Sequence, residues 1–416
     1  MKIWWLNHHA RPPVVPGITR HYSLARELGK LGHSTMVVNS SFDHLGTMLP
    51  EGPEFGASLE QPLLREFDGV DFLSIPTPGY EGNSSLGRIR NMHAFYRRSM
   101  DILKTERYGK PDIVIGSVVH TWGAFAGYKL AKHFHVPFVY ELRDLWPLTL
   151  VELGGLNRFH PLVLYFDHLD RIMVQEASLV ITSAPLMKNY YKERWNIPEE
   201  KFLWITNGTD LEAFKKVRQN AREEKNTTKI EIYYTGSLGY ANAVTDLVDV
   251  LIRKKGHFDN IHFHLYGSGP LKEKLEKISE DSELNLTIKD PVAKNQIPEL
   301  LMKADVLFFS LKDSPIFRYG ISPNKLADYH AAGKPILIVG NFAANPVIEA
   351  GSGISIPSFQ DLPEALEKLS FAGSEELEDM GQKGFEYAVE NYDWAQLAEK
   401  LNFRLSKLAS AQNQRS

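Results

Sequence analysis

The segment Ser322-Pro323-Asn324-Lys325 has the residue types of an anion-binding helix start. Serine is a favoured N-cap and proline fits the first helical position, so a helix is predicted from Ser322 to a stop at Gly333. The free N–H groups of a helix N-terminus attract phosphate, and Lys325 adds a positive charge. Asp328 lies about one turn further on, where it can accept hydrogen bonds from ribose hydroxyls. The alternative is an ordinary capped helix with solvated Lys and Asp side chains.

Polar residues also follow three predicted strands in the first half of the chain. His8 and His9 follow the first strand, His120 a later one, and Arg143 with Asp144 the strand after that. Ligands of parallel α/β sheets bind at the carboxyl ends of strands, so these side chains are candidates for lining a cleft. The alternatives are polar loop residues for the histidines and a structural ion pair for Arg143 and Asp144.

Metal and thiol chemistry find little support in the sequence. It contains no cysteine, which excludes disulfides, thiolate nucleophiles and Cys-based zinc sites. Asp167, His168 and Asp170 fall in a helical pattern and are expected on a solvated face. We therefore expect no metal site and no cofactor.

The composition is that of an ordinary globular protein, with 416 residues, 43% apolar and 24% charged, which favours two domains. A formal net charge of -4 gives no basic field of the kind that nucleic-acid binders show. No apolar run approaches the ~20 residues of a membrane span, and the N-terminus becomes polar too early for a signal peptide. We expect a cytoplasmic protein, at most peripheral on the inner face of the cell membrane.

Short apolar runs alternate with amphipathic helical stretches, a rhythm that predicts parallel sheets covered by helices on both sides. The first series of strands is expected at 2–6, 34–38, 113–115, 138–142, 179–182 and 202–205. After a polar stretch at 215–229 a second series is expected at 231–234, 262–266, 285–288, 306–309 and 336–339. The prediction is an α/β protein of two Rossmann-like, doubly wound domains, 1–206 and 207–392, that face each other across a cleft. A final helix at about 393–409 is a candidate to pack back on the first domain.

The run from Tyr319 to Pro335 resembles the donor-binding signature of family 4 glycosyltransferases, which have the two-domain GT-B fold. It is most similar to the bacterial subgroup that builds O-antigen, capsule and exopolysaccharide. Three further segments resemble family motifs in the same order along the chain. They are Pro12–His21, Arg143–Pro147 and Asn207–Asp210.

The resemblance implies a role for each matched residue. It implies that Lys325, Arg20, His120 and Arg143 take part in catalysis, and that Asp328 contacts the ribose. It also implies a set of residues that bind the sugar donor. These are Gly17, Gly236, Ser237, Gly267, Val292, Arg318, Tyr319, Gly320, Ile321, Ser322, Asn324, Lys325 and Asp328.

Two departures from the family pattern put parts of that site in doubt. Gly320 stands where the family has the first glutamate of a Glu-x7-Glu motif, and the loop Gly236–Ala243 lacks the usual Arg and Lys. Without a metal ion, other groups must neutralise the leaving diphosphate. The candidates are Lys325, the helix N-terminus, Arg318, and Arg20 or Arg143.

The segment Arg88–Lys110 carries seven basic and two acidic residues beside an apolar stripe that includes Phe95, Met100 and Leu103. Such a basic amphipathic helix can lie on an anionic membrane surface. The alternative is a surface helix packed on its own domain. The membrane interpretation suits the resemblance, since acceptors in the subgroup are commonly polyprenyl-diphosphate-linked saccharides.

We therefore expect a metal-independent, retaining glycosyltransferase. It would move a sugar from a nucleotide-diphosphate donor, a UDP-sugar by expectation, to the hydroxyl of a saccharide or lipid-linked saccharide. One alternative is a nucleotide-sugar 2-epimerase of the same fold, which would need acid and base carboxylates in the cleft. The other is a non-catalytic, two-domain sugar-binding protein.

Overall fold

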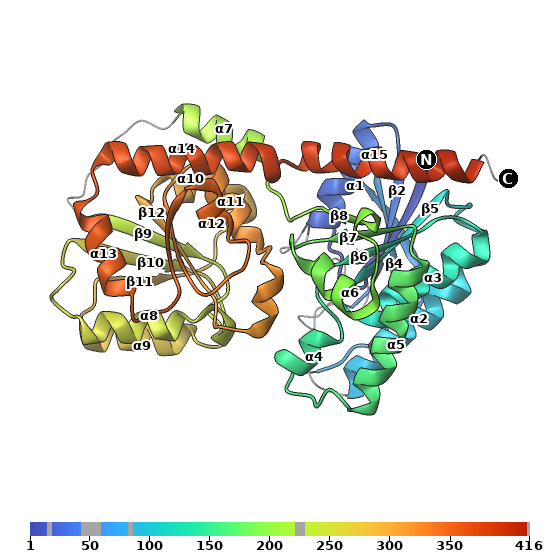
Figure 1. Cartoon of the computed structure of the whole chain (residues 1–416), viewed down its shortest axis with the longest axis horizontal. Helices are drawn as coiled ribbons and strands as arrows, with labels where there is room; N and C mark the ends of the chain where they lie inside the picture. Colours follow the sequence, from blue (N-terminus) through green and yellow to red (C-terminus); the bar gives the residue numbers. More distant parts are fainter. Residues whose placement is uncertain (15–18, 43–59, 82–85, 221–228, 414–416) are drawn as a thin grey trace. The chain divides into compact units, whose positions relative to one another are not determined.

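The structure is a computed structural model that describes residues 1–14, 19–42, 60–81, 86–220 and 229–413. The chain divides into two compact units. One unit contains Met1–Thr206 together with Trp394–Ser416, and the other contains Asn207–Asp393. Each unit is an α/β layer structure built on one sheet (Figure 1).

The first unit has an eight-stranded sheet in the order β3-β4-β2-β1-β5-β6-β7-β8. Neighbouring strands are parallel except for the antiparallel pair β3 and β4. The strands are β1 Lys2–Leu6, β2 Ser34–Ser40, β3 Leu63–Phe67, β4 Val70–Ile75, β5 Ile113–Val118, β6 Phe138–Leu142, β7 Leu179–Thr182 and β8 Phe202–Trp204. The helices are α1 Arg20–Lys30, α2 Leu86–Leu103, α3 Thr121–Phe134, α4 Leu148–Glu152, α5 Pro161–Glu176, α6 Met187–Trp195 and α15 Trp394–Asn413.

The C-terminal helix α15 packs on one face of this sheet beside α1 (Figure 1). Leu397, Leu401 and Leu405 are buried at helical spacing among apolar side chains of β1, β5 and α1. The chain thus returns to its first unit because this amphipathic stripe completes an apolar core.

The second unit has a six-stranded, all-parallel sheet in the order β11-β10-β9-β12-β13-β14. The strands are β9 Ile230–Thr235, β10 Ile261–Tyr266, β11 Leu286–Lys289, β12 Val306–Ser310, β13 Ile336–Val339 and β14 Gly353–Ile356. The helices are α7 Leu211–Asn220, α8 Val244–Arg253, α9 Lys272–Ser282, α10 Ile297–Met302, α11 Asn324–Ala332, α12 Pro346–Ala350, α13 Leu362–Phe371 and α14 Ser374–Asn391. Short 3-10 turns include η2 Tyr240–Asn242 and η4 Pro315–Tyr319.

The predicted fold class is confirmed, since both units are parallel α/β sheets with helices on both faces. In such sheets the strand order reverses at one place, and the loops there diverge to open a ligand site. The reversal lies between β1 and β5 in the first unit and between β9 and β12 in the second. The loops that follow these four strands therefore mark where a site can form in each unit.

Much of the apolar stripe of helix α2 packs on its own domain, as in the alternative interpretation of the sequence. Its apolar side chains Phe95, Met100 and Leu103 are buried within the first unit, because the stripe packs on its own domain. Only Leu86 and Ile89, near its start, are exposed large apolar residues. Among the described residues, no helix combines the length and apolar character needed to cross a membrane.

Candidate functional site

Two glycine loops meet at the carboxyl edge of the second sheet, after β9 and β10. The N–H of Gly236 donates to the carbonyl of Tyr266 at 2.9 Å, and the N–H of Leu238 donates to that of Ser268 at 2.8 Å. A Cβ on Gly267 would lie 1.8 Å from the Gly236 carbonyl oxygen, so no larger residue fits there. The loops thus pack backbone against backbone and leave Ser237 exposed at the edge.

Lys325 lies in the first turn of α11 and reaches the loop after β9. Its Nζ donates to the Tyr234 hydroxyl at 2.9 Å and to Asn242 Oδ1 at 3.4 Å. It also lies 4.1 Å from the centroid of the Tyr234 ring. A Cβ on Gly236 would be only 2.6 Å from Nζ, so the ammonium rests against the bare backbone of that glycine. One lysine therefore places its charge in the loop that lacks the family's Arg and Lys.

The surroundings of Lys325 destabilise its charged form. The hydroxyl, the amide and the aromatic ring around Nζ carry no negative charge, and burial lowers the pKa of Lys325 to about 7. Burial raises the pKa of Tyr234, so the phenol stays neutral. An anion placed beside Nζ would meet an ammonium whose charge nothing else has compensated.

The helix α11 begins one residue later than predicted. Its first residue is Asn324 and its N-cap is Pro323, in extended conformation and without a side-chain cap. The Ser322 hydroxyl instead accepts from the N–H of Asn207 at 3.1 Å, and the Ser322 carbonyl accepts from the Asn207 amide at 2.6 Å. The prediction that Ser322 caps the helix was therefore wrong, because this serine ties the segment after β8 to the start of α11.

The residues before the helix differ in exposure. Tyr319 and Ile321 are buried, whereas Arg318 is exposed and its guanidinium lies 4.9 Å from the Tyr319 ring centroid. Gly320 has a φ of 85°, a left-handed conformation that side chains other than glycine rarely adopt. A glutamate at this position would be strained, which explains in physical terms why the loop departs from the family's acidic motif.

Asp328 is already engaged within its own unit. Its carboxylate accepts from the Thr209 hydroxyl at 2.5 Å, and burial raises its pKa. Val292 follows β11 and is partly buried against the apolar cluster beneath α11. Asn207 binds Ser322 and Thr209 binds Asp328, so the segment Asn207–Thr209 holds the first half of α11 in place.

In the first unit, three histidines gather where the strand order reverses. The ring centroid of His8 lies 4.5 Å from that of His120 and 4.5 Å from that of His9. His120 is the N-cap of α3, and its Nδ1 accepts from the N–H of Gly123 at 3.2 Å. Its Nε2 is buried and has no hydrogen-bond partner among the described residues. Burial, with neighbouring His9 and Arg88, holds the pKa of His120 well below its usual range, so the ring is neutral.

Arg20 does not supply a spare charge. It is 1% exposed, and its Nε donates to Glu141 Oε1 at 2.9 Å. Its Nη2 donates to the carbonyl of Ile205 at 2.9 Å, and its Nη1 donates to that of Thr206. Its charge is thus balanced by a buried carboxylate, and the role of Arg20 in neutralising the diphosphate stays a prediction that this pairing does not support.

Glu141 was not predicted as a site residue. It is the one charged residue of the buried strand β6, and a charge in such a strand indicates a buried partner of opposite charge. Besides Arg20, it accepts a hydrogen bond from Trp5 Nε1 at 3.0 Å and lies 3.1 Å from His21 Nε2. Arg143 is partly buried and lies close enough to affect the pKa values of Arg20 and Glu141. The predicted residue Gly17 lies outside the described residues.

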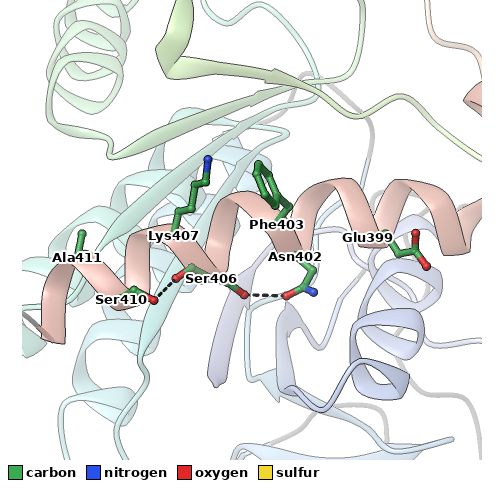
Figure 2. Close-up of a pocket in the computed structure, with 7 residues that line it drawn as sticks. All are labelled: Glu399, Asn402, Phe403, Ser406, Lys407, Ser410 and Ala411. Carbon is green, nitrogen blue, oxygen red and sulfur yellow. Dashed lines mark hydrogen bonds between the residues drawn. The ribbon is translucent and has the colours of Figure 1, made fainter.

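A shallow hollow elsewhere in the first unit holds none of the predicted site residues. Figure 2 shows its lining side chains along one helix, α15, with Lys407 Nζ 4.2 Å from the Phe403 ring centroid. The lining residues are Glu399, Asn402, Phe403, Ser406, Lys407, Ser410 and Ala411.

Known proteins resemble the chain over almost its whole length. Residues 17–213 match the family model "Glycosyltransferase Family 4", and residues 229–370 match the model "Glycosyl transferases group 1". The structure of a sucrose-phosphate synthase from Thermosynechococcus elongatus has a TM-score of 0.74 at 15% identity, covering 99% of each chain. WaaG, a glycosyltransferase involved in lipopolysaccharide biosynthesis, has a TM-score of 0.62 at 15% identity, covering 96% of this chain and 98% of its own.

HepE from Anabaena, solved with UDP-glucose, has a TM-score of 0.63 at 15% identity, covering 98% of this chain and 100% of its own. No curated protein matches the sequence. The fold and the two family models define the chain as a GT-B glycosyltransferase. Its first unit carries the family 4 domain, and its second unit carries the group 1 domain.

Proposed function

We propose that this glycosyltransferase takes its sugar from a nucleotide diphosphate, a UDP-sugar in the first instance, held by the second unit. The observation that carries the proposal is the Lys325 ammonium at the start of α11, against the backbone of Gly236. The loops after β9 and β12 flank the reversal of strand order, where doubly wound sheets bind nucleotides. Neighbours solved with UDP or UDP-glucose support the choice of donor.

In the proposed mechanism, the bond between the sugar and the diphosphate breaks, and negative charge develops on the leaving phosphate. The ammonium of Lys325 and the free N–H groups at the start of α11, including that of Asn324, stabilise this charge. The backbone of the Gly236 and Gly267 loops allows the phosphates to approach closely. We expect no metal ion to be needed, because the bound diphosphate favours the ammonium form of Lys325 in the first turn of α11.

We propose further that the sugar is transferred with retention of its anomeric configuration, and that the leaving phosphate accepts the proton of the attacking hydroxyl. The neutral His120, with its unpartnered Nε2, would contact the sugar as a hydrogen-bonding group rather than as a cation. Asp328 keeps one carboxylate oxygen for the ribose while the other accepts from Thr209. These roles for His120 and Asp328 follow from the family resemblance and agree with their positions at the two strand reversals.

A panel of nucleotide sugars tests this function. The full-length chain should melt at a higher temperature with its donor, since a ligand that binds only the native state stabilises it. The best donor is then incubated with and without candidate acceptors, and the products are analysed by mass spectrometry. Transfer to an acceptor supports the proposal, whereas an epimerised nucleotide sugar formed without any acceptor would favour the epimerase alternative. Binding without any turnover would favour a sugar-binding protein.

Surface-polysaccharide synthesis with a lipid-linked saccharide as acceptor is the biological setting we propose. The exposed basic residues Arg90 and Arg97 of α2, with Leu86 at its start, support contact with an anionic membrane.

Charge reversal on α2 is expected to weaken membrane binding. In a liposome flotation assay, Arg90→Glu with Arg97→Glu should reduce the affinity for vesicles of anionic lipid by about 30-fold or more, because each basic residue near such a surface contributes about 1 kcal/mol. Arg98 is left unchanged because its guanidinium donates to the carbonyl of Pro76 at 2.9 Å. Neutral vesicles serve as the control, and equal flotation of both proteins on anionic vesicles would contradict the membrane proposal.

The affinity for the nucleotide sugar is expected to fall above about pH 7. Lys325, with its pKa lowered to about 7, is an ammonium below that pH and loses its proton above it. The bound diphosphate favours the ammonium and raises this pKa, so binding above pH 7 must take up a proton. The dissociation constant should rise up to about tenfold per pH unit. Calorimetry between pH 6 and 9 measures this slope, and Lys325→Met should flatten it. A slope that persists in Lys325→Met would assign the titration to another group.

A further inference from the structure

A cluster of three polar side chains lies on one face of the second unit's sheet, away from the edge described above. Glu231 is on β9 and His262 directly opposite it on β10, where the two residues pair in the parallel register. His264 is two residues further along β10, so its side chain points to the same face. Neighbouring strands thus bring one carboxylate and two imidazoles together without any loop.

The ligand atoms of the three residues are already close to one another. One oxygen or nitrogen from each residue lies within 4.8 Å of those of the other two. His264 Nε2 is 2.5 Å from Glu231 Oε2, and the two imidazole rings stack at 4.3 Å with planes 6° apart. All three residues are partly buried, so their positions are restrained by the sheet.

Both histidines present Nε2 to polar partners on the neighbouring strands. Because a carboxylate only accepts, the 2.5 Å contact makes His264 Nε2 the proton donor to Glu231 in the metal-free protein. A cation bound between the two residues takes the place of this proton, and the imidazole then carries its proton on Nδ1 instead. His262 Nε2 lies 2.8 Å from the Thr287 hydroxyl, which can orient the ring as an outer-shell partner does.

We propose that Glu231, His262 and His264 bind a divalent cation of the zinc class, with water as a fourth ligand. Two histidines and a glutamate are a ligand set that zinc accepts in tetrahedral geometry, with bonds of about 2.0–2.2 Å. Ligand atoms then lie roughly 3.4 Å apart. Side-chain rotation must therefore open the 2.5 Å contact between His264 and Glu231 and close any wider separation, the present upper limit being 4.8 Å. Lys229 and Lys289 lie near enough to affect the pKa of His262. Their positive charges repel a bound cation and so reduce the affinity of the site for it.

The cation would act on stability and not on sugar transfer. Glu231 lies four residues, roughly 13 Å, before Thr235 at the end of β9, and His264 lies two residues, roughly 7 Å, before Tyr266 at the end of β10. A cation held by these residues ties together two neighbouring strands within the sheet, below the loops of the donor site. The inference is therefore independent of the proposed function and goes beyond it.

Calorimetric titration of the full-length, chelator-treated protein with zinc chloride at pH 7.5 tests the proposal. We expect one zinc per chain with a dissociation constant in the micromolar range or below, and no comparable binding of Mg²⁺, which prefers oxygen ligands. Zinc should raise the melting temperature measured by scanning calorimetry by about 5 °C. His264→Gln and His262→Gln should each weaken binding at least tenfold, whereas His257→Gln, at an exposed histidine outside the cluster, should not.

Two results would overturn the proposal. One is the absence of zinc binding by the folded wild-type chain, with folding checked by circular dichroism. The other is binding that persists unchanged when both His262 and His264 are replaced, which would place the cation elsewhere. A donor that still binds the chelator-treated protein would keep the proposed function intact, so the two proposals fail separately.

Discussion

Replacing Lys325 with methionine is expected to lower the rate of sugar transfer about 100- to 1000-fold while the fold is retained. That range is typical for removal of one preorganised group that stabilises developing negative charge. The effect should be large here because the loop from Gly236 to Ala243 has no basic residue to take over. Methionine keeps the unbranched shape of the side chain while removing the charge that lies over the rings of Tyr234 and Phe309, so the fold should be retained.

The control is Lys303→Met, which removes an exposed lysine at the end of α10, before β12 and so at the opposite end of the sheet. Initial rates with the donor identified by the nucleotide panel, over a range of donor concentrations, give kcat and KM for each variant. Activity of Lys325→Met within fivefold of the wild type would refute the central role of this lysine. The control variant should match the wild type.

The same substitution should stabilise the protein. The folded-state pKa of Lys325 is depressed to about 7 from an ordinary value of 10.5, so the unfolded chain binds the proton more tightly. The destabilising effect of the ammonium is therefore complete below about pH 7 and fades toward pH 10.5. Lys325→Met should accordingly melt at a higher temperature than the wild type at pH 6, with a smaller difference at pH 9. A gain in stability with a loss of activity would distinguish a functional charge from a structural one.

The fold could be predicted from the sequence because its central strands are continuous apolar runs. Ile113–Val118 and Ile336–Val339 are buried on both faces. A strand of this kind can be predicted from its own residues, without knowledge of the strands beside it. The strands that the sequence analysis omitted are at or near sheet edges. In β3, Leu63–Phe67, exposed residues alternate with partly buried ones, and β14 begins with a glycine. Edge strands contain fewer apolar residues because part of their surface is exposed to solvent, so the sequence predicts them less clearly.

The site could be placed from the sequence only in part. The glycine loops and Lys325 follow from local residue types, since a helix start and a tight turn are properties of a few neighbouring residues. The start of α11 could not be fixed, because Ser322 is held by Asn207, 115 residues earlier in the chain. For the same reason the resemblance assigned Arg20 to the diphosphate, whereas its partner Glu141 lies 121 residues away. Hydrogen bonds and ion pairs between residues far apart in the chain produce no local sequence pattern, so a single sequence does not predict them.

Replacing Glu141 with leucine is expected to destabilise the first unit by about 3–5 kcal/mol. The Arg20–Glu141 pair has no exposed side-chain surface, and loss of one partner leaves a buried, uncompensated charge. Trp5 Nε1 would lose one of its acceptors as well. The pKa of Glu141 is held well below its usual range, and the Arg20 guanidinium is the largest attraction acting on it. The stabilisation by this pair is therefore present above the ordinary pKa of a glutamate and lost as the pH falls through the lowered folded-state value.

Tryptophan fluorescence during urea denaturation isolates this effect, because all seven tryptophans lie in the first unit. The midpoint should move to lower urea for Glu141→Leu and recover in part when Arg20→Met is added, since an apolar pair often replaces a buried ion pair without loss. Recovery should be incomplete, because Arg20 also donates to the carbonyls of Ile205 and Thr206. Glu199→Leu, which breaks the exposed pair with Lys188, should leave the midpoint unchanged. Equal midpoints for Glu141→Leu and Glu199→Leu would contradict the expectation that the buried Arg20–Glu141 pair stabilises the first unit.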